Sequence, residues 1–175
     1  MELYFKYGKS FYPDILKKYN ISENDSDEDI NYASFEFLCE VLGNSSFFVE
    51  AETKGSEDEG FTYLFPRKRF VSEHGRIITG IVMPQWWPNA MDGTHETNIF
   101  SNSVQELVDL IVKAFSEYYG LEIHSKLFFW DKDVTLLISD SSEEINESYD
   151  WLKNVYRQSK LESEKRKSKE RKQLN

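Results

Sequence analysis

Residues 83–100 read MPQWWPNAMDGTHETNIF and hold two adjacent tryptophans between two prolines. In an extended backbone successive side chains point to opposite faces, so Trp86 and Trp87 cannot both point inward. An outward-facing tryptophan is typical of a binding anchor, because it buries a large rigid ring at little entropic cost. The other interpretation is that both rings pack over a sheet edge. We predict that Trp86 and Trp87 contact a partner.

The same segment contains Asp92, His95 and Glu96, whose side chains are of the types that bind zinc or a harder metal. The zinc-protease pattern H-E-x-x-H requires a second histidine at position 99, and the chain has Ile99 there. We therefore interpret these three residues as a polar turn and expect no metal site.

An acidic segment near residue 25 has the spacing of a calcium-binding loop. Asp25, Asp27 and Asp29 match the start of an EF-hand loop, and Glu36 falls at its twelfth position. The sixth position must turn sharply and is normally glycine, whereas this chain has the β-branched Ile30. Carboxylates that favour the positive end of a helix explain the same residues more simply.

No nucleophile elbow, phosphate-binding loop or dinucleotide-binding loop occurs in the chain. Glu50, Glu52 and Lys54 have a spacing like that of metal-dependent nucleases, in which carboxylates hold a metal ion and a lysine steadies the attacking water. Cys39 lies within an apolar helical stretch and is interpreted as a core residue. We expect no cofactor.

The formal net charge of −10 is unevenly distributed along the 175 residues. Residues 157–175 contain eight Lys and Arg against three Glu, which gives +5, so residues 1–156 carry −15. An acidic body repels nucleic acid and attracts a basic partner, whereas the tail has the opposite preference. The acidic residues predicted to steer a partner are Asp25, Asp27, Glu28, Asp29, Glu57, Asp58 and Glu59.

Apolar spacing and capping residues predict the elements. Helices are expected over 12–20, from a cap at Ser26 or Asp27 to Leu42, over 103–120, and from the Ser141–Glu144 capping box onward. Strands are expected over 2–8, 46–53 and 61–66, with one hairpin of 67–73 and 76–83 and another of 121–130 and 134–140. The apolar face of 103–120 includes Tyr118.

This order predicts an α+β fold in one domain, with a mostly antiparallel sheet built from hairpins and three to four helices packed on one side of it. The domain is predicted to span 1–156, followed by a basic extension, 157–175, that is either a solvated helix or disordered. With one cysteine, no signal peptide and no apolar run long enough to span a membrane, we expect a cytoplasmic protein.

Because no catalytic pattern is complete, we expect a binding protein rather than an enzyme. The hypothesis is a small acidic inhibitor that neutralises a basic partner, as toxin immunity proteins and phage-encoded inhibitors of host nucleases or defence proteins do. The alternative is a metal-dependent hydrolase or nuclease that uses Glu50, Glu52 and Lys54, or the Asp92 segment. A third option is an adaptor whose basic tail binds nucleic acid while its body binds protein.

Overall fold

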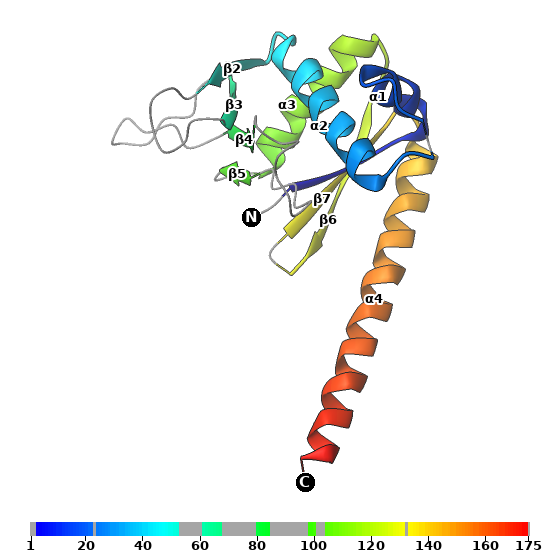
Figure 1. Ribbon diagram of the computed structural model, residues 1–175. Coiled ribbons are helices and arrows are strands. Elements are labelled where there is room, and N and C mark those ends of the chain that lie inside the picture. The colour runs from blue at the N-terminus through cyan, green and yellow to red at the C-terminus, as the bar shows by residue number, and fades with distance from the viewer. Residues whose placement is uncertain are drawn as a thin grey trace, which may run out of the picture.

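The computed structural model describes residues 3–22, 24–52, 61–67, 80–84, 98–100, 104–131 and 133–174, and the account below concerns these residues (Figure 1). The elements in chain order are β1 (Leu3–Tyr7), the 3-10 turn η1 (Lys9–Phe11), α1 (Tyr12–Lys18), α2 (Asp27–Gly43), β2 (Phe48–Glu52), β3 (Phe61–Pro66), β4 (Gly80–Pro84), β5 (Asn98–Phe100), α3 (Val104–Tyr119), β6 (His124–Trp130), β7 (Asp133–Ser139) and α4 (Ser142–Gln173). The chain is an α+β domain.

The described strands form two sheets. One has the order β1-β7-β6, in which β1 runs parallel to β7 and β6 runs antiparallel to it. The other has the order β2-β3-β4-β5, and all of its neighbours are antiparallel. The first sheet brings residues 3–7 beside residues 134–138, so it joins the two ends of the domain.

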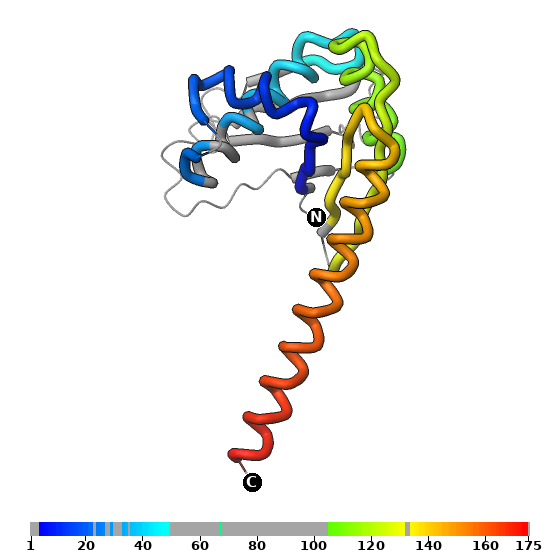
Figure 2. The backbone as a smooth tube through the Cα atoms, turned by 90° about the vertical axis from the view of Figure 1, so that its right-hand side faces the viewer, coloured from blue at the N-terminus to red at the C-terminus, as the bar shows by residue number. Residues whose placement is uncertain are grey.

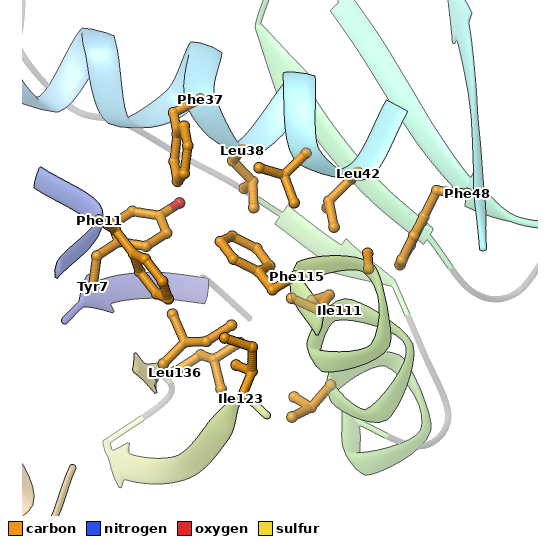
Figure 3. Close-up of a cluster of buried hydrophobic side chains, with 14 of the residues drawn as sticks. Tyr7, Phe11, Phe37, Leu38, Leu42, Phe48, Ile111, Phe115, Ile123 and Leu136 are labelled. Atoms are coloured by element: carbon orange, nitrogen blue, oxygen red, sulfur yellow. The ribbon is translucent and has the colours of Figure 1, made fainter. Parts of the chain in front are cut away.

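The central strand β7 is buried on both faces. Val134, Leu136 and Ile138 belong to the main core together with side chains of β1, α2 and α3, as Figure 3 shows for part of that cluster. Thr135 and Leu137 alternate with them and are also buried. Because successive side chains of a strand point to opposite faces, these two lie on the other face of the sheet.

The second face of this sheet is covered by α4. Its first part packs on β6 and β7, where Tyr149 and Tyr156 meet Phe128 edge-on at ring-centroid distances of 5.7 and 6.1 Å. Beyond that contact α4 extends away from the rest of the molecule, as both views show (Figure 2). No helix in the described part of the chain combines the length and the apolar character that crossing a bilayer requires.

Two features of the predicted fold are corrected. The described strands make two sheets rather than one, and helices lie on both faces of the β1-β7-β6 sheet. The described pairs are mostly antiparallel as predicted, and the parallel pairing of β1 with β7 is the exception. Since β1 and β7 lie far apart in the sequence, no tight turn imposes the antiparallel arrangement of a hairpin. The sequence does carry a signal for burial on both faces, because residues 134–138 form a nearly continuous apolar run.

One predicted hairpin is confirmed and the other changes. Strands β6 and β7 form the predicted antiparallel pair. Strand β4, however, pairs with 61–66, placing Leu64 opposite Ile81, whereas the prediction paired it with 67–73. Residues 68–79, which include the predicted turn, lie outside the described chain.

The predicted start of α2 and the predicted end of α3 are confirmed. Ser26 caps α2 by accepting the Asp29 backbone N–H at 3.2 Å, and Gly120 ends α3 with a positive φ of 64°. Helix α4 runs unbroken to Gln173, so the helical form of the basic extension is the one observed. The predicted Ser141–Glu144 capping box is confirmed for one of its two hydrogen bonds. Ser141 Oγ accepts the Glu144 N–H at 3.2 Å, but the Glu144 carboxylate turns elsewhere.

That carboxylate joins the start of α4 to the turn after β1. Glu144 accepts the Lys9 backbone N–H at 2.9 Å and the Ser139 hydroxyl at 2.8 Å. Ser139 Oγ in turn accepts the Ser141 N–H at 3.0 Å. The chain at Gly8 passes so close that a Cβ there would lie 2.3 Å from Ser139 Oγ. We call Gly8, Lys9, Ser139, Ser141 and Glu144 the α4 clasp.

We expect Gly8→Ala to destabilise the protein by about 1–3 kcal/mol, because the added methyl group forces the clasp apart. The matched control is Gly120→Ala, where nothing lies within 4 Å of the new Cβ and only the positive φ is unfavourable. That control should cost only about 1 kcal/mol. Urea denaturation measures both changes. An unfolding midpoint of Gly8→Ala equal to that of the wild type would contradict the close approach at the clasp.

Candidate interaction surfaces

Helix α2 carries an acidic stripe on one side. Asp29, Glu36 and Glu40 follow one another at intervals of seven and four residues, which places them on the same side of a helix. Asp29 is exposed, and Glu36 and Glu40 are half-exposed. The opposite side of α2 is buried through Phe37, Leu38, Val41 and Leu42, so packing of this apolar face turns the acidic stripe toward solvent.

The stripe ends at a corner where α1, α2 and α3 meet, which we define by Asp14, Glu40, Tyr118 and Tyr119. The Tyr119 hydroxyl donates to Asp14 at 2.8 Å, and Lys18 of α1 pairs with Glu40 at 2.6 Å. The ring of Tyr118 packs edge-on against those of Tyr119 and Phe37, at centroid distances of 5.0 and 6.2 Å. Tyr118 remains 43% exposed.

The corner holds both tyrosines in the neutral form. Burial, followed by the hydrogen bond to Asp14 and the charge of that carboxylate, raises the pKa of Tyr119 well above its ordinary value. Burial also raises the pKa of Tyr118, with smaller contributions from Glu40 and Asp14 that Lys18 partly offsets. The corner therefore presents phenol hydroxyl groups beside carboxylates, a combination that accepts and donates hydrogen bonds.

The exposed Tyr118 corrects the prediction that this residue lies on the buried face of its helix. Its position fits the apolar periodicity of α3, and Leu107, Val108, Ile111 and Phe115 on that face are buried as expected. Tyr118 lies in the last turn of α3, and its exposure leaves an aromatic ring at the surface. The sequence signal that could have revealed it is the tyrosine pair Tyr118–Tyr119 next to the end of the helix.

Two of the predicted steering acids are described with their side chains. Asp25 accepts the Ser22 backbone N–H at 2.6 Å, and Asp29 accepts the Ser26 hydroxyl at 2.7 Å. Both are exposed. Asp25 closes the turn before α2, and Asp29 lies in the first turn of the helix, where a carboxylate is favourable. The structure describes Asp27 and Glu28 as part of α2, but their side chains lie outside the described part.

The calcium-loop interpretation of Asp25, Asp27, Asp29 and Glu36 is wrong. Helix α2 begins at Asp27, so residues 27–36 are helical rather than wrapped around an ion. Neither here nor elsewhere in the described chain do three or more His, Cys, Asp or Glu side chains gather in a way that could hold a metal.

The remaining predicted site residues lie outside the described residues. They are Trp86 and Trp87, the steering acids Glu57, Asp58 and Glu59, and Asp92, His95, Glu96 and Lys54. Of the proposed nuclease pattern, Glu50 and Glu52 belong to β2, an edge strand of the described four-stranded sheet, but their side chains are not described. These assignments stay predictions.

Comparison with known proteins adds no relative, since no protein-family model, curated protein or solved structure matches the chain.

We expect Tyr119→Phe to lower stability by about 1 kcal/mol at neutral pH through loss of the hydrogen bond to Asp14. The raised pKa of Tyr119 also makes stability fall as pH rises above about 10, because the unfolded chain releases this proton while the folded chain keeps it. Tyr119→Phe should make that alkaline decline shallower. Urea denaturation between neutral pH and pH 11 measures this, and an unchanged slope would show that Tyr119 does not contribute.

Proposed function

We propose that this protein binds a basic protein partner through the acidic stripe of α2 and the adjoining corner, and thereby inhibits it. The observation that carries the proposal is the coincidence of the two features on one surface. Asp29 and Glu36 supply negative charge in line with Glu40, which is paired with Lys18, and the exposed Tyr118 ring lies where that stripe ends. Steering charge and an aromatic anchor are the two components that a tight, fast-forming complex requires.

The charge of the body supports fast encounter. Residues 1–156 carry −15, and neither Asp29 nor Glu36 lies within 4 Å of a described side-chain cation. Such a field raises the association rate with a basic protein by one or more orders of magnitude at low salt. This charge favours a basic partner over an acidic one.

The packing around Tyr118 supports an anchor. Its ring is held between Phe37 and Tyr119, so little side-chain freedom is lost when a partner covers it. Tyrosine also combines a large apolar ring with a hydroxyl that can donate to a partner's carbonyl oxygen. The predicted anchors Trp86 and Trp87 remain part of the hypothesis as a second contact.

The proposal places the activity in the cytoplasm, because the single Cys39 allows no disulfide within the chain. Toxin immunity proteins and phage-encoded inhibitors of nucleases or defence proteins are the classes that fit a small acidic inhibitor of this kind. No described observation favours the hydrolase alternative over this proposal.

The electrostatic part is tested with Glu36→Lys combined with Glu40→Gln. We expect the association rate with the partner, captured from a lysate of the source organism and then purified, to fall about tenfold at low salt. Its salt dependence should also become flatter. Stopped-flow fluorescence or surface plasmon resonance at several ionic strengths measures both.

The matched control is Asp150→Lys combined with Glu147→Gln, which changes the net charge equally at exposed positions of α4. This control should leave most of the association rate intact. Equal losses in both variants would show that overall charge acts rather than the α2 stripe. No loss in either variant would sink the proposal.

The anchor is tested separately with Tyr118→Ala. We expect the dissociation rate to rise at least tenfold while the association rate changes little, because the contact forms after encounter. Phe129→Ala is the control, since Phe129 is 60% exposed on β6, away from the corner. Equal dissociation rates for Tyr118→Ala and the wild type would exclude Tyr118 as an anchor.

A further inference from the structure

The outer part of α4 is exposed to solvent beyond its packing on the sheet. Packing onto the sheet ends at Tyr156, whose hydroxyl donates to Asp131 at 3.2 Å. From residue 157 to 174 every described residue is exposed, although the backbone stays helical to Gln173. We call residues 157–173 the α4 arm. At 1.5 Å per residue it is ~25 Å long.

The cations of the arm are not neutralised by its own acids. The arm carries Arg157, Lys160, Lys165, Arg166, Lys167, Lys169, Arg171 and Lys172. Within the described chain, none of them lies within 4 Å of a carboxylate, although Glu162, Glu164 and Glu170 belong to the same helix. Eight cations are therefore available to an outside anion.

From Lys165 outward, one side of the arm carries cations and no acid, whereas Glu162 lies three residues before Lys165 on that side. Lys165, Lys169 and Lys172 are spaced four and three residues apart, which aligns them on one side of the helix. No glutamate lies three or four residues from Lys169 or Lys172. This cationic row lies in the outer half of the arm.

The cationic row lies far enough from the acidic body for the two surfaces to bind their partners independently. Lys165 is nine residues beyond Tyr156, which corresponds to ~14 Å along the helix axis. The Debye length at physiological ionic strength is ~8 Å, so repulsion from the body is largely screened at the row. In both views the arm runs away from the body rather than back onto it (Figures 1 and 2).

The composition of the arm favours one class of polyanion. Its only large apolar side chain is Leu161, so it lacks the apolar face by which amphipathic helices insert into lipid or pack on a partner helix. Contacts with a phosphate backbone need no apolar face, because they draw on cations and the release of counterions. An α-helix, ~10–12 Å wide, also fits the major groove of duplex DNA.

We propose that the α4 arm binds the phosphate backbone of duplex nucleic acid without sequence preference, with Lys165, Lys169 and Lys172 as its main contacts. The arm thereby gives the protein a second binding surface of opposite charge to the body. This surface is independent of the partner proposed for the α2 stripe.

The test measures binding of the full-length protein to a labelled 20-bp DNA duplex and the equivalent RNA duplex by fluorescence anisotropy, over a range of salt concentrations. Replacing Lys165, Lys169 and Lys172 by Gln should weaken binding at least tenfold. The slope of log K against log salt should become shallower by ~2.7, because each phosphate contact contributes ~0.9. Circular dichroism should show that helicity is kept, since Lys and Gln have similar helix propensities.

The matched control replaces Lys17, Lys113 and Lys153, three exposed lysines of the body and of the start of α4, by Gln. It removes the same charge and should leave affinity and salt slope nearly unchanged. An equal loss in the control, or no binding by the wild type, would overturn the proposal. Competition by polyglutamate as strong as that by DNA of equal charge, or tighter binding to phosphatidylserine vesicles, would overturn it as well.

The variant Glu36→Lys/Glu40→Gln separates this inference from the proposed inhibitor function. The α2 stripe lies on the body, so this variant should keep the duplex affinity of the wild type even where it loses the basic partner. A parallel loss of both activities would show that the arm and the body do not act independently, and would overturn the proposal for the arm.

Discussion

Burial of β7 on both faces is the constraint on which the rest of the structure depends. One face of this strand completes the core with α2 and α3, and the other receives α4. Its two neighbours, β1 and β6, bring the start of the chain and the last hairpin to the same sheet. A polar substitution at Leu136 would therefore disturb the core formed with α2 and α3, and one at Leu137 would disturb the face that α4 covers. Both layers are built on the same strand.

The same arrangement determines where charge lies. Because the apolar side of α2 packs into the core, its acidic side must face solvent, and the corner with Tyr118 and Tyr119 forms where α3 ends beside it. Because α4 packs on the sheet only as far as Tyr156, its basic remainder projects into solvent. Opposite charges within one chain are thus kept apart by packing and by the stiffness of a helix.

The α4 clasp connects these two consequences. Glu144 accepts hydrogen bonds from the Lys9 backbone N–H and the Ser139 hydroxyl, so the start of α4 is fixed to the turn between β1 and α1. A helix fixed at its base holds its far end at a definite distance from the body, which a flexible linker would not do. Separation of the two surfaces therefore depends on these hydrogen bonds together with the packing of α4 on β6 and β7.

The sequence by itself determined where the helices of the body lie, the β6–β7 hairpin and the uneven charge, because apolar periodicity, turn residues and charge are local properties. It narrowed the cap of α2 to Ser26 or Asp27 and left the basic extension as either helical or disordered. It could not determine the parallel pairing of β1 with β7, since that pairing joins distant segments with no turn to signal it. Nor could it show that Tyr118 is exposed. Periodicity predicts which side of a helix a residue lies on, but it does not predict how far along the helix the neighbouring elements cover that side. The sequence likewise could not show that the Glu144 carboxylate binds Lys9 and Ser139 instead of completing the capping box, because only the tertiary structure brings these residues within hydrogen-bonding distance.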